Sequence, residues 1–388
     1  MKAYEYLKDL CEFQHRGSAT HNEQRAGEYI AQQMDRLGYK VRFQNFSAPR
    51  DRLYAYIAEI GIIVLLIGIV SLFIPNPIIP AILLILPIVM LILEVKGSLK
   101  ELDFLPKYPS QNVMAYNTLD VNKKTIVVSG HYDTQKASIL FSPSFAGVVP
   151  IFFNIIYACL GIIILTVILA IFLPISLNGI LNAIKIPALA IIGTGIVFML
   201  YCNHSGSYTN GANDNGTGTA LAMAMADRIS QDPEGYRNIN TVFLFTGCEE
   251  VGSKGMKAFI KEYNERLNRD NTYFLILDNI GSGRITYLEG EGMLIYRRYD
   301  QQLKKLAKDM KEKYPDRVQV QKNLLLPTDS LPLLNLGYST ITFLGKDEKG
   351  NIANYHWHAD TLDKIDSKFF NFCEDFFMEY YYKMIKEL

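Results

Sequence analysis

The chain has 388 residues, of which 49% are hydrophobic, and its 39 basic and 39 acidic side chains cancel to a formal net charge of zero. No run of lysine and arginine is long enough to suggest a nucleic-acid-binding surface, so we expect no nucleic-acid partner. The five cysteines have no C-x-x-C spacing, which argues against a disulfide framework or a zinc knuckle and is compatible with a reducing compartment.

The N-terminal segment predicts two amphipathic helices and a strand. Helical apolar spacing covers residues 2–14 and 22–37, and Gly38 is a natural end for the second helix. Residues 41–46 alternate as a strand does. Because this segment has no apolar core of the signal-peptide type, we expect that the chain is not exported whole.

Four long apolar stretches follow, and each approaches the ~20 residues that cross a bilayer. They are Leu53–Ile74, Ile78–Val95, Val148–Leu173 and Ile180–Cys202. Short proline-containing turns join the first to the second and the third to the fourth, which predicts two transmembrane helical hairpins. The alternative is a set of buried core helices, which rarely run so long without a charge. Glu59 leaves the first stretch only ~15 uninterrupted apolar residues, short of a full span.

Two hairpins leave all the remaining segments on one side of the membrane. Basic residues flank the spans on that side, namely Arg50, Arg52, Lys96, Lys100 and Lys136. The two opposite turns contain no lysine or arginine, although Lys185 lies a little inside the fourth stretch. This bias predicts a multi-pass membrane protein whose partner is the lipid bilayer and whose catalytic part is cytoplasmic.

The remainder of the chain alternates strands with helices. Strands are predicted at 112–116, 125–129, 241–246, 273–277 and 340–344, and helices at 218–229 and 254–268. Continuous apolar strands alternating with helices indicate an α/β domain with a mostly parallel mixed sheet covered on both faces. We expect this domain in three parts (1–52, 96–147 and 203–388), interrupted by hairpins at 53–95 and 148–202.

Acidic and histidine motifs fall at the ends of these strands. GHYDT (Gly130–Thr134) follows one strand, TGCEEVGS (Thr246–Ser253) ends another, and Asp278 directly follows a third. GANDNGTG (Gly211–Gly218) precedes a helix, and HWHADT begins at His356. Because ligands bind beyond the carboxyl ends of the strands in open parallel sheets, we expect these side chains to converge.

The residue types predict a two-metal hydrolytic site. A carboxylate can bridge two cations, and Asp214, in a glycine-rich turn, is the candidate bridge. His131 and Asp278 would complete one metal site, and Glu250 and His356 the other. Imidazole and carboxylate ligands without thiolate suit two Zn²⁺ ions best, with Mn²⁺ or Co²⁺ as alternatives.

Three neighbouring residues have other expected roles. Asp133 would accept a hydrogen bond from the His131 imidazole and fix its tautomer. Glu249 would be the acid left free of metal, able to take a proton from the attacking water and pass it to the leaving amine. Cys248 is interpreted as a packing residue rather than a ligand.

With these motifs in order, the chain resembles the family of aminopeptidase Y and bacterial leucyl aminopeptidase, the co-catalytic zinc peptidases. The resemblance runs through GHYDT, GANDNGTGTA, FTGCEEVGSKGM, LDNIG and H-x-x-A-D-T-L-D-K-I-D and covers nearly all of the soluble part. It implies a phosphorylase/hydrolase-like zinc-exopeptidase fold and the removal of N-terminal residues from peptides. It also assigns the metal ligands and the general acid/base to the residues named above: His131, Asp214, Glu250, Asp278, His356 and Glu249.

Two departures from the family pattern affect the interpretation. The final motif carries two histidines, and the spacing to Asp360 favours His356 over His358 as the ligand. The hairpins are insertions, and the second leaves directly from the H-x-D loop. We therefore expect the catalytic mouth near the bilayer surface and a substrate with an apolar part, such as a hydrophobic peptide, a membrane-protein tail or an aminoacylated lipid.

Two other functions remain as alternatives. One is a glutaminyl-cyclase-like acyltransferase with a single zinc, and the other is a catalytically inactive membrane scaffold. The complete ligand set argues against both. The Thr328-Asp329-Ser330 sequence is given no catalytic role, because a helix N-cap explains it more simply.

Overall fold

Two compact units make up the chain in the computed structural model. The first comprises Met1–Arg50, Leu105–Ala137 and Ser207–Leu388, and the second Asp51–Phe104 and Ser138–Gly206. The structure describes residues 2–50, 55–96, 98, 104–232, 236, 238–292, 295–323 and 327–388. Three residues named in the sequence interpretation, Arg52, Leu53 and Lys100, lie outside them.

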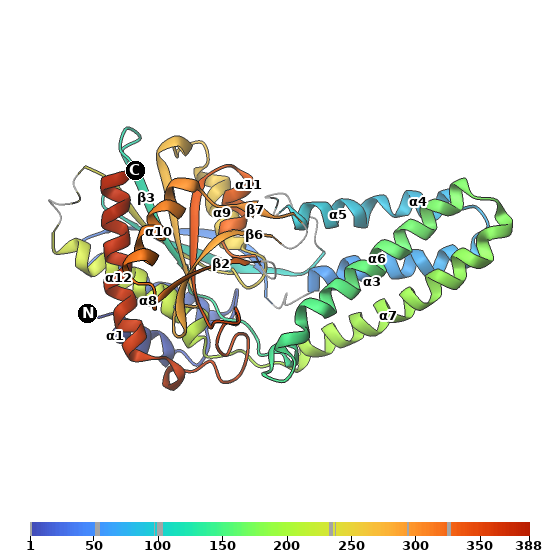
Figure 1. Ribbon diagram of the computed structural model, residues 1–388, viewed down its shortest axis with the longest axis horizontal. Coiled ribbons are helices and arrows are strands. Elements are labelled where there is room, and N and C mark those ends of the chain that lie inside the picture. Colours follow the sequence, from blue (N-terminus) through green and yellow to red (C-terminus); the bar gives the residue numbers. More distant parts are fainter. Residues whose placement is uncertain are drawn as a thin grey trace. The chain divides into compact units, whose positions relative to one another are not determined.

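A nine-stranded mixed sheet forms the centre of the first unit (Figure 1). Its strands are β1 (Lys40–Pro49), β2 (Lys107–Tyr116), β3 (Thr125–His131), β4 (Asn240–Thr246), β5 (Thr272–Asp278), β6 (Arg284–Glu291), β7 (Arg297–Arg298), β8 (Val318–Asn323) and β9 (Ser339–Lys346). The spatial order is β1-β2-β4-β3-β5-β9-β6-β7, and β8 also pairs with β6. The four central strands, β4, β3, β5 and β9, run parallel, whereas β1, β2 and β6 pair with their inner neighbours in antiparallel fashion. The prediction of a mixed sheet with a parallel centre is confirmed.

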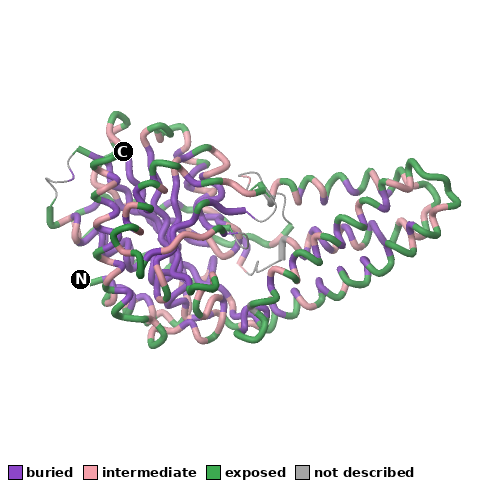
Figure 2. The backbone as a smooth tube through the Cα atoms, viewed as in Figure 1, coloured by how far each residue is buried: buried purple, intermediate pink, exposed green. Residues whose placement is uncertain are grey.

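Helices cover both faces of this sheet. One face carries α1 (Ala3–Glu12), α2 (His21–Arg36), α8 (Thr217–Ser230), α10 (Gln301–Lys313) and α12 (Ser367–Glu387), which share one large core with the strands. The other face carries α9 (Lys254–Tyr263) and α11 (Ser330–Asn335). There Phe274 of β5 makes edge contacts with Phe259 of α9 and with Tyr338. Burial is concentrated in the strands between these layers (Figure 2).

Most of the predicted elements occur close to their expected positions. Gly38 ends the second helix at a φ of 86°, where a side chain would be strained. The helix expected at 254–268 ends earlier, at Tyr263. Strands β6 to β8 and helices α10 to α12 were not anticipated. Short helical turns occur at Ile139–Phe141, Ala146–Val148, Ile175–Leu177, Arg269–Asn271 and Leu362–Lys364. Ala212–Gly216 is a kinked turn whose backbone is not helical at Asp214 and Asn215.

The second unit consists of apolar helices. They are α3 (Ala55–Phe73), α4 (Ile78–Leu83), α5 (Ile85–Val95), α6 (Val149–Phe172) and α7 (Asn178–Ser205). Helices α3, α6 and α7 pack on one another, and Gly68 of α3 lies close to Ile163 and Leu189. Such small residues let helices approach closely.

Four membrane-crossing helices were expected, but only two described segments are long and apolar enough to span a bilayer. These are Val149–Phe172 and Ile175–Ser205, whereas Ile57–Phe73 and Ile78–Leu93 are shorter. At 1.5 Å per residue, Ile57–Phe73 extends only about 26 Å, against a hydrocarbon core of ~30 Å. The second stretch divides at Leu84, because Pro87 has no N–H to donate to the carbonyl four residues earlier.

Candidate metal centre

The parallel strands bring three of the motifs to one edge of the sheet. His131 ends β3 and Asp278 ends β5, while Glu249 and Glu250 follow the end of β4. Glycine lets a fourth motif approach the same edge. A Cβ on Gly218, at the start of α8, would lie 2.2 Å from the Leu277 carbonyl oxygen, so only glycine fits there. This close approach holds the turn that contains Asp214 beside β3 and β5.

Two histidines and three carboxylates meet at this edge. Oδ1 of Asp214 lies 3.4 Å from His131 Nε2, and Oδ2 of the same carboxylate lies 3.1 Å from His356 Nε2. Asp278 Oδ1 is 3.5 Å from His131 Nε2, and Glu250 Oε2 is 3.0 Å from His356 Nε2. The structure thus brings all five predicted ligands together, in the two groups that the sequence suggested.

The donor set fits divalent metal ions. Candidate ligand atoms of His131, Asp214 and Glu250 all lie within 4.8 Å of one another. Oε1 of Glu250 and Oδ2 of Asp214 are buried and accept no hydrogen bond from any residue that the structure describes. Buried acceptors without a donor are costly unless a cation satisfies them. Imidazole and carboxylate groups without thiolate are typical ligands of catalytic zinc.

The electrostatics of the two histidines lead to the same conclusion. Burial lowers the pKa of His356, but the facing carboxylates of Glu250 and Asp214 outweigh it and raise that pKa to about 10. Burial also lowers the pKa of His131, but the carboxylates of Asp133, Asp214 and Asp278 outweigh this effect. The pKa of His131 therefore lies well above its usual value. The carboxylates therefore strongly favour positive charge at the positions that the two imidazoles face.

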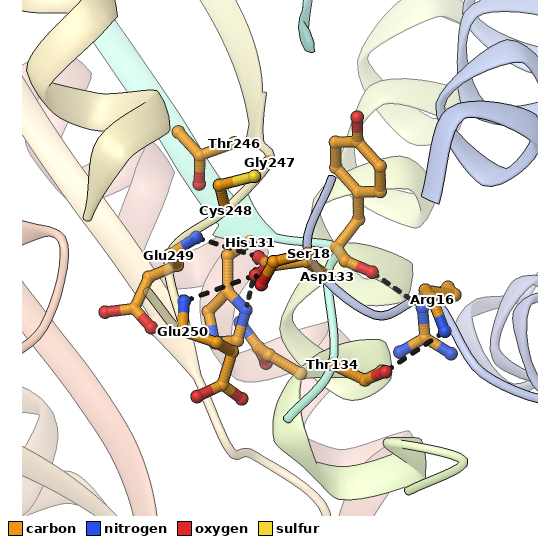
Figure 3. Close-up of polar contacts among 12 residues, drawn as sticks. Arg16, Ser18, His131, Asp133, Thr134, Thr246, Gly247, Cys248, Glu249 and Glu250 are labelled. Carbon is orange, nitrogen blue, oxygen red and sulfur yellow. Dashed lines mark hydrogen bonds and ion pairs between the residues drawn. The ribbon is translucent and has the colours of Figure 1, made fainter. Parts of the chain in front are cut away.

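Asp133 connects the histidine to the two glutamates (Figure 3). Its Oδ1 lies 3.4 Å from His131 Nδ1 and accepts the backbone N–H of Glu249 over 2.9 Å. Its Oδ2 accepts the N–H of Glu250 over 3.2 Å and the Ser18 hydroxyl over 2.7 Å. Asp133 therefore holds the backbone that carries the glutamate pair and lies beside the His131 ring, although His131 Nδ1 makes no hydrogen bond to any residue that the structure describes.

Glu249 lies outside the histidine–carboxylate pairs. Its side chain points in a different direction from that of Glu250 (Figure 3), and its Oε1 accepts the Ser253 hydroxyl over 3.4 Å. Burial raises the pKa of Glu249 well above its usual value, His131 opposes this, and the nearby carboxylates of Asp329, Glu250 and Asp278 add to it. A carboxyl group with a raised pKa holds a proton more readily than an ordinary glutamate, which suits a group that accepts and donates protons.

The structure distinguishes between the two histidines of the last motif. His356 is 3% exposed and lies in the cluster, whereas His358 is exposed. Asp360 holds the bridging turn, because its Oδ1 and Oδ2 accept the backbone N–H groups of Asn213 and Asp214 over 2.6 and 3.0 Å. Asn279 donates its amide to both Asp214 and Asp278, over 3.0 and 2.7 Å. The LDNIG and HWHADT motifs contain these two supporting residues.

Arg16 is a supporting residue that the sequence analysis missed. Its fully buried guanidinium donates only to backbone carbonyls, over 2.7 to 3.2 Å; the acceptors belong to Leu10, Tyr132, Asn210 and Gly211. Figure 3 shows it beside the segment that follows His131. Arg16 thereby joins the first helix, the H-x-D segment and the start of the Asp214 turn. No periodicity of the sequence marks such a role.

Cys248 and Asp329 take up positions next to the site. The Cys248 N–H and Sγ both lie close to Glu23 Oε1, at 2.9 and 3.3 Å, and burial raises the pKa of this thiol well above its usual value. It is a buried packing residue, as expected. Asp329 makes no side-chain cap on α11, contrary to the N-cap interpretation, and instead accepts the Thr246 hydroxyl over 2.5 Å.

Solved structures share this fold at low sequence identity. The zinc aminopeptidase BSAP of Bacillus subtilis superposes with a TM-score of 0.57 at 13% identity, covering 98% of this chain and 94% of its own. A Zn-dependent exopeptidase of Parabacteroides distasonis gives 0.54 at 14% identity, covering 97% and 96%. The glutaminyl cyclase of Porphyromonas gingivalis gives 0.56 at 12% identity, covering 99% and 97%. These superpositions show a common fold, and at identities this low they show the fold alone.

A match to a protein family comes from the sequence itself. The comparison with curated proteins finds no match. Residues 196–381 match peptidase family M28, and this range includes four of the five candidate ligands together with Glu249. The fifth, His131, joins them in space. The match covers just under half of the chain, and together with the shared fold it supports a zinc-dependent metallo-aminopeptidase similar to those of peptidase family M28.

Proposed function

We propose that the chain is a membrane-embedded aminopeptidase that holds two zinc ions and removes N-terminal residues from peptides with an apolar part. The observation that carries the two-metal proposal is the position of Asp214, whose two carboxylate oxygens face two different histidines. His131 and Asp278 would hold one ion and His356 and Glu250 the other, with Asp214 shared. When bound, two such ions acidify the attacking water and polarise the scissile carbonyl.

The chain's own residues would move the proton. Glu249 would accept a proton from the attacking water and then donate it to the leaving amine, as its raised pKa supports. Asp133 would keep the His131 ring and the Glu249 backbone in place throughout, because it contacts both. Asn279 would orient the Asp214 and Asp278 carboxylates.

The surface of the second unit supports a membrane location. Only 33% of the most apolar window of α6 and 39% of that of α7 are buried, which is too little for core helices of a soluble protein. Large apolar side chains are exposed along these helices, including Leu165 at 55% and Val197 at 69%. A helix that is apolar all round suits lipid rather than water. We propose that α6 and α7 span the bilayer and that the shorter first hairpin spans it beside them, near the lower limit of ~17 residues.

The flanking charges support a cytoplasmic catalytic unit. This orientation is tested by placing single cysteines in a variant without native cysteines, at Asn76 in one turn and at Asp316 in the first unit. A membrane-impermeant maleimide added to intact cells should label the Asn76 position and not the Asp316 position. Labelling of the Asp316 position alone would show that the orientation is opposite to the one proposed.

Peptidase activity is tested with full-length protein purified in detergent and a panel of fluorogenic aminoacyl amides. We expect hydrolysis that a chelator abolishes and that added zinc restores. Peptides with a C-terminal apolar segment should show a higher kcat/KM than equally long polar peptides with the same N-terminal residue. Metal-dependent cyclisation of N-terminal glutamine without hydrolysis of the panel would instead favour the glutaminyl-cyclase alternative.

A further inference from the structure

The helices of the second unit enclose a polar cavity of about 210 Å³ close to the turns between α3 and α4 and between α6 and α7. An engineered apolar cavity of ~150 Å³ is large enough to bind benzene, so this space can accept a group of several atoms. Its walls come from four helices and include both apolar and polar side chains. The polar residues among them are Ser71, Asn178, Asn182 and Lys185.

Lys185 lies in the wall of this cavity and is only 2% exposed. Its ammonium group donates to Ser71 Oγ over 2.7 Å and to Asn182 Oδ1 over 3.3 Å. Both partners are neutral, and no described carboxylate pairs with it. A buried lysine without a counter-ion is costly, and more so within a bilayer.

Among the residues that the structure describes, the rest of the bundle offers no acidic partner at this end. Helices α6 and α7 contain no aspartate or glutamate, and α3 contains only Glu59. Glu59 precedes Ser71 on the same helix by about 18 Å along its axis. Glu94 lies at the end of α5 that is remote from the turn.

The polar residues of α7 form one stripe. Asn178, Asn182 and Lys185 follow one another at intervals of four and three residues, so they share a face of the helix. Two side-chain amides and an ammonium group supply several donors to the same space. Exposed apolar side chains surround it, including Phe73 at 79%, Phe172 at 76% and Ile175 at 74%.

We propose that this cavity binds a phosphate-bearing anion, and that its occupant in the membrane is the headgroup of an anionic phospholipid. The phosphate would supply the counter-ion that Lys185 lacks and accept hydrogen bonds from the asparagine amides. The acyl chains would lie on the exposed apolar surface around the cavity. The site is separate from the peptidase reaction, but its lipid occupant rests on the proposed membrane location.

The test uses full-length protein in neutral detergent, with dioleoylphosphatidylglycerol as probe and dioleoylphosphatidylcholine for comparison. Native mass spectrometry counts retained lipids, and thermal unfolding reports stabilisation. We expect the wild type to retain one phosphatidylglycerol per chain in preference to phosphatidylcholine. Lys185→Met should weaken this preference about tenfold or more, because a charge-assisted hydrogen bond is lost.

Lys96→Met is the matched control, because it removes an exposed cation from the far end of α5 and should keep the preference. Unchanged hydrolysis of a soluble aminoacyl amide shows that Lys185→Met is folded. If it does not fold, Asn182→Leu serves in its place and should lower the preference. Equal retention of the two lipids by the wild type together with no Lys185-dependent stabilisation by inorganic phosphate, or an unchanged preference in the variant, would overturn the proposal.

Inorganic phosphate distinguishes the source of the anion. Stabilisation by millimolar phosphate that depends on Lys185, without selective lipid retention, would support the anion site and assign it to a soluble ligand. Selective retention of phosphatidylglycerol without an effect of phosphate would support the lipid headgroup.

Discussion

The backbone N–H of Glu249 donates to Oδ1 of Asp133 over 2.9 Å, and the same oxygen lies 3.4 Å from the imidazole of His131. One carboxylate thus positions a candidate metal ligand and the candidate general base. His131 ends β3 and Glu249 follows the end of β4, and the parallel pairing of these two strands brings His131 opposite Thr246.

Asp133→Asn is expected to weaken zinc binding about 10- to 100-fold, as loss of a partner of a metal-bound histidine does. The amide replaces one acceptor with a donor, which would oppose the N–H of Glu249 or of Glu250. Competition with a chromogenic zinc chelator measures this affinity. Ser18→Ala removes only the hydroxyl on Oδ2 and should have a much smaller effect. Wild-type zinc affinity in Asp133→Asn would show that Asp133 does not position His131.

Glu249→Gln is expected to lower kcat about 10²- to 10⁴-fold, because the amide cannot transfer a proton. Zinc content should remain at the wild-type level, since Glu249 lies outside the described histidine–carboxylate pairs. Steady-state kinetics on the best aminoacyl amide, with metal analysis of the same sample, measures both. Glu265→Gln, an exposed glutamate that follows α9, is the matched control. A variant that loses zinc would make Glu249 a ligand instead.

The fold centre and the ligands could be predicted because local signals are strong there. The central strands are continuous apolar runs, and three of the ligand motifs stand at strand ends, so the position of His131 or Asp278 follows from the rules of parallel sheets. By contrast, β6 to β8 lie at one side of the sheet and are less uniformly apolar; β8 contains Gln319, Gln321 and Lys322.

The supporting residues were harder to predict because their partners are distant in the chain. Arg16 donates hydrogen bonds to backbone carbonyls as distant in the sequence as that of Gly211, and the Glu23 carboxylate accepts the N–H of Cys248. Such contacts depend on tertiary structure and leave no periodic pattern. The helix lengths of the first hairpin were overestimated for a different reason, because composition alone did not reveal the break at Leu84.

Arg16→Met is expected to lower the free energy of unfolding by about 3 kcal/mol or more, because several buried carbonyls lose their donors. Arg16→Lys should rescue little of this, since an ammonium group cannot reproduce the planar array of donors. Denaturant unfolding followed by tryptophan fluorescence provides the measurement. For comparison, Arg42→Met removes a largely exposed pair with Glu262 and should cost less than about 1 kcal/mol. An effect of Arg16→Met no larger than that of Arg42→Met would refute a structural role.

Glu291 is expected to make stability depend on pH. Burial raises the pKa of its carboxyl group to about 7, although the Thr328 N–H and hydroxyl oppose the shift. Because this pKa is above the unfolded value, the contribution of Glu291 is complete below about pH 4.5 and is lost as the pH rises through 7.

Glu291→Gln should therefore flatten the fall of thermal stability between pH 5 and pH 8. The exposed Glu289→Gln on the same strand should leave the slope as in the wild type. Apparent Tm values at several pH values, in one detergent and at constant ionic strength, provide the test. Parallel slopes for wild type and Glu291→Gln would show that this carboxyl does not titrate in the expected range.

Counting the zinc ions on full-length protein tests the proposed bridging role of Asp214 most directly. The protein is purified in detergent, saturated with zinc, freed of excess metal by gel filtration and analysed by inductively coupled plasma mass spectrometry. The proposal predicts two zinc ions per chain in the wild type and fewer in Asp214→Asn, with loss of aminoacyl-amide hydrolysis. One zinc ion per chain in a fully active wild-type protein would contradict it.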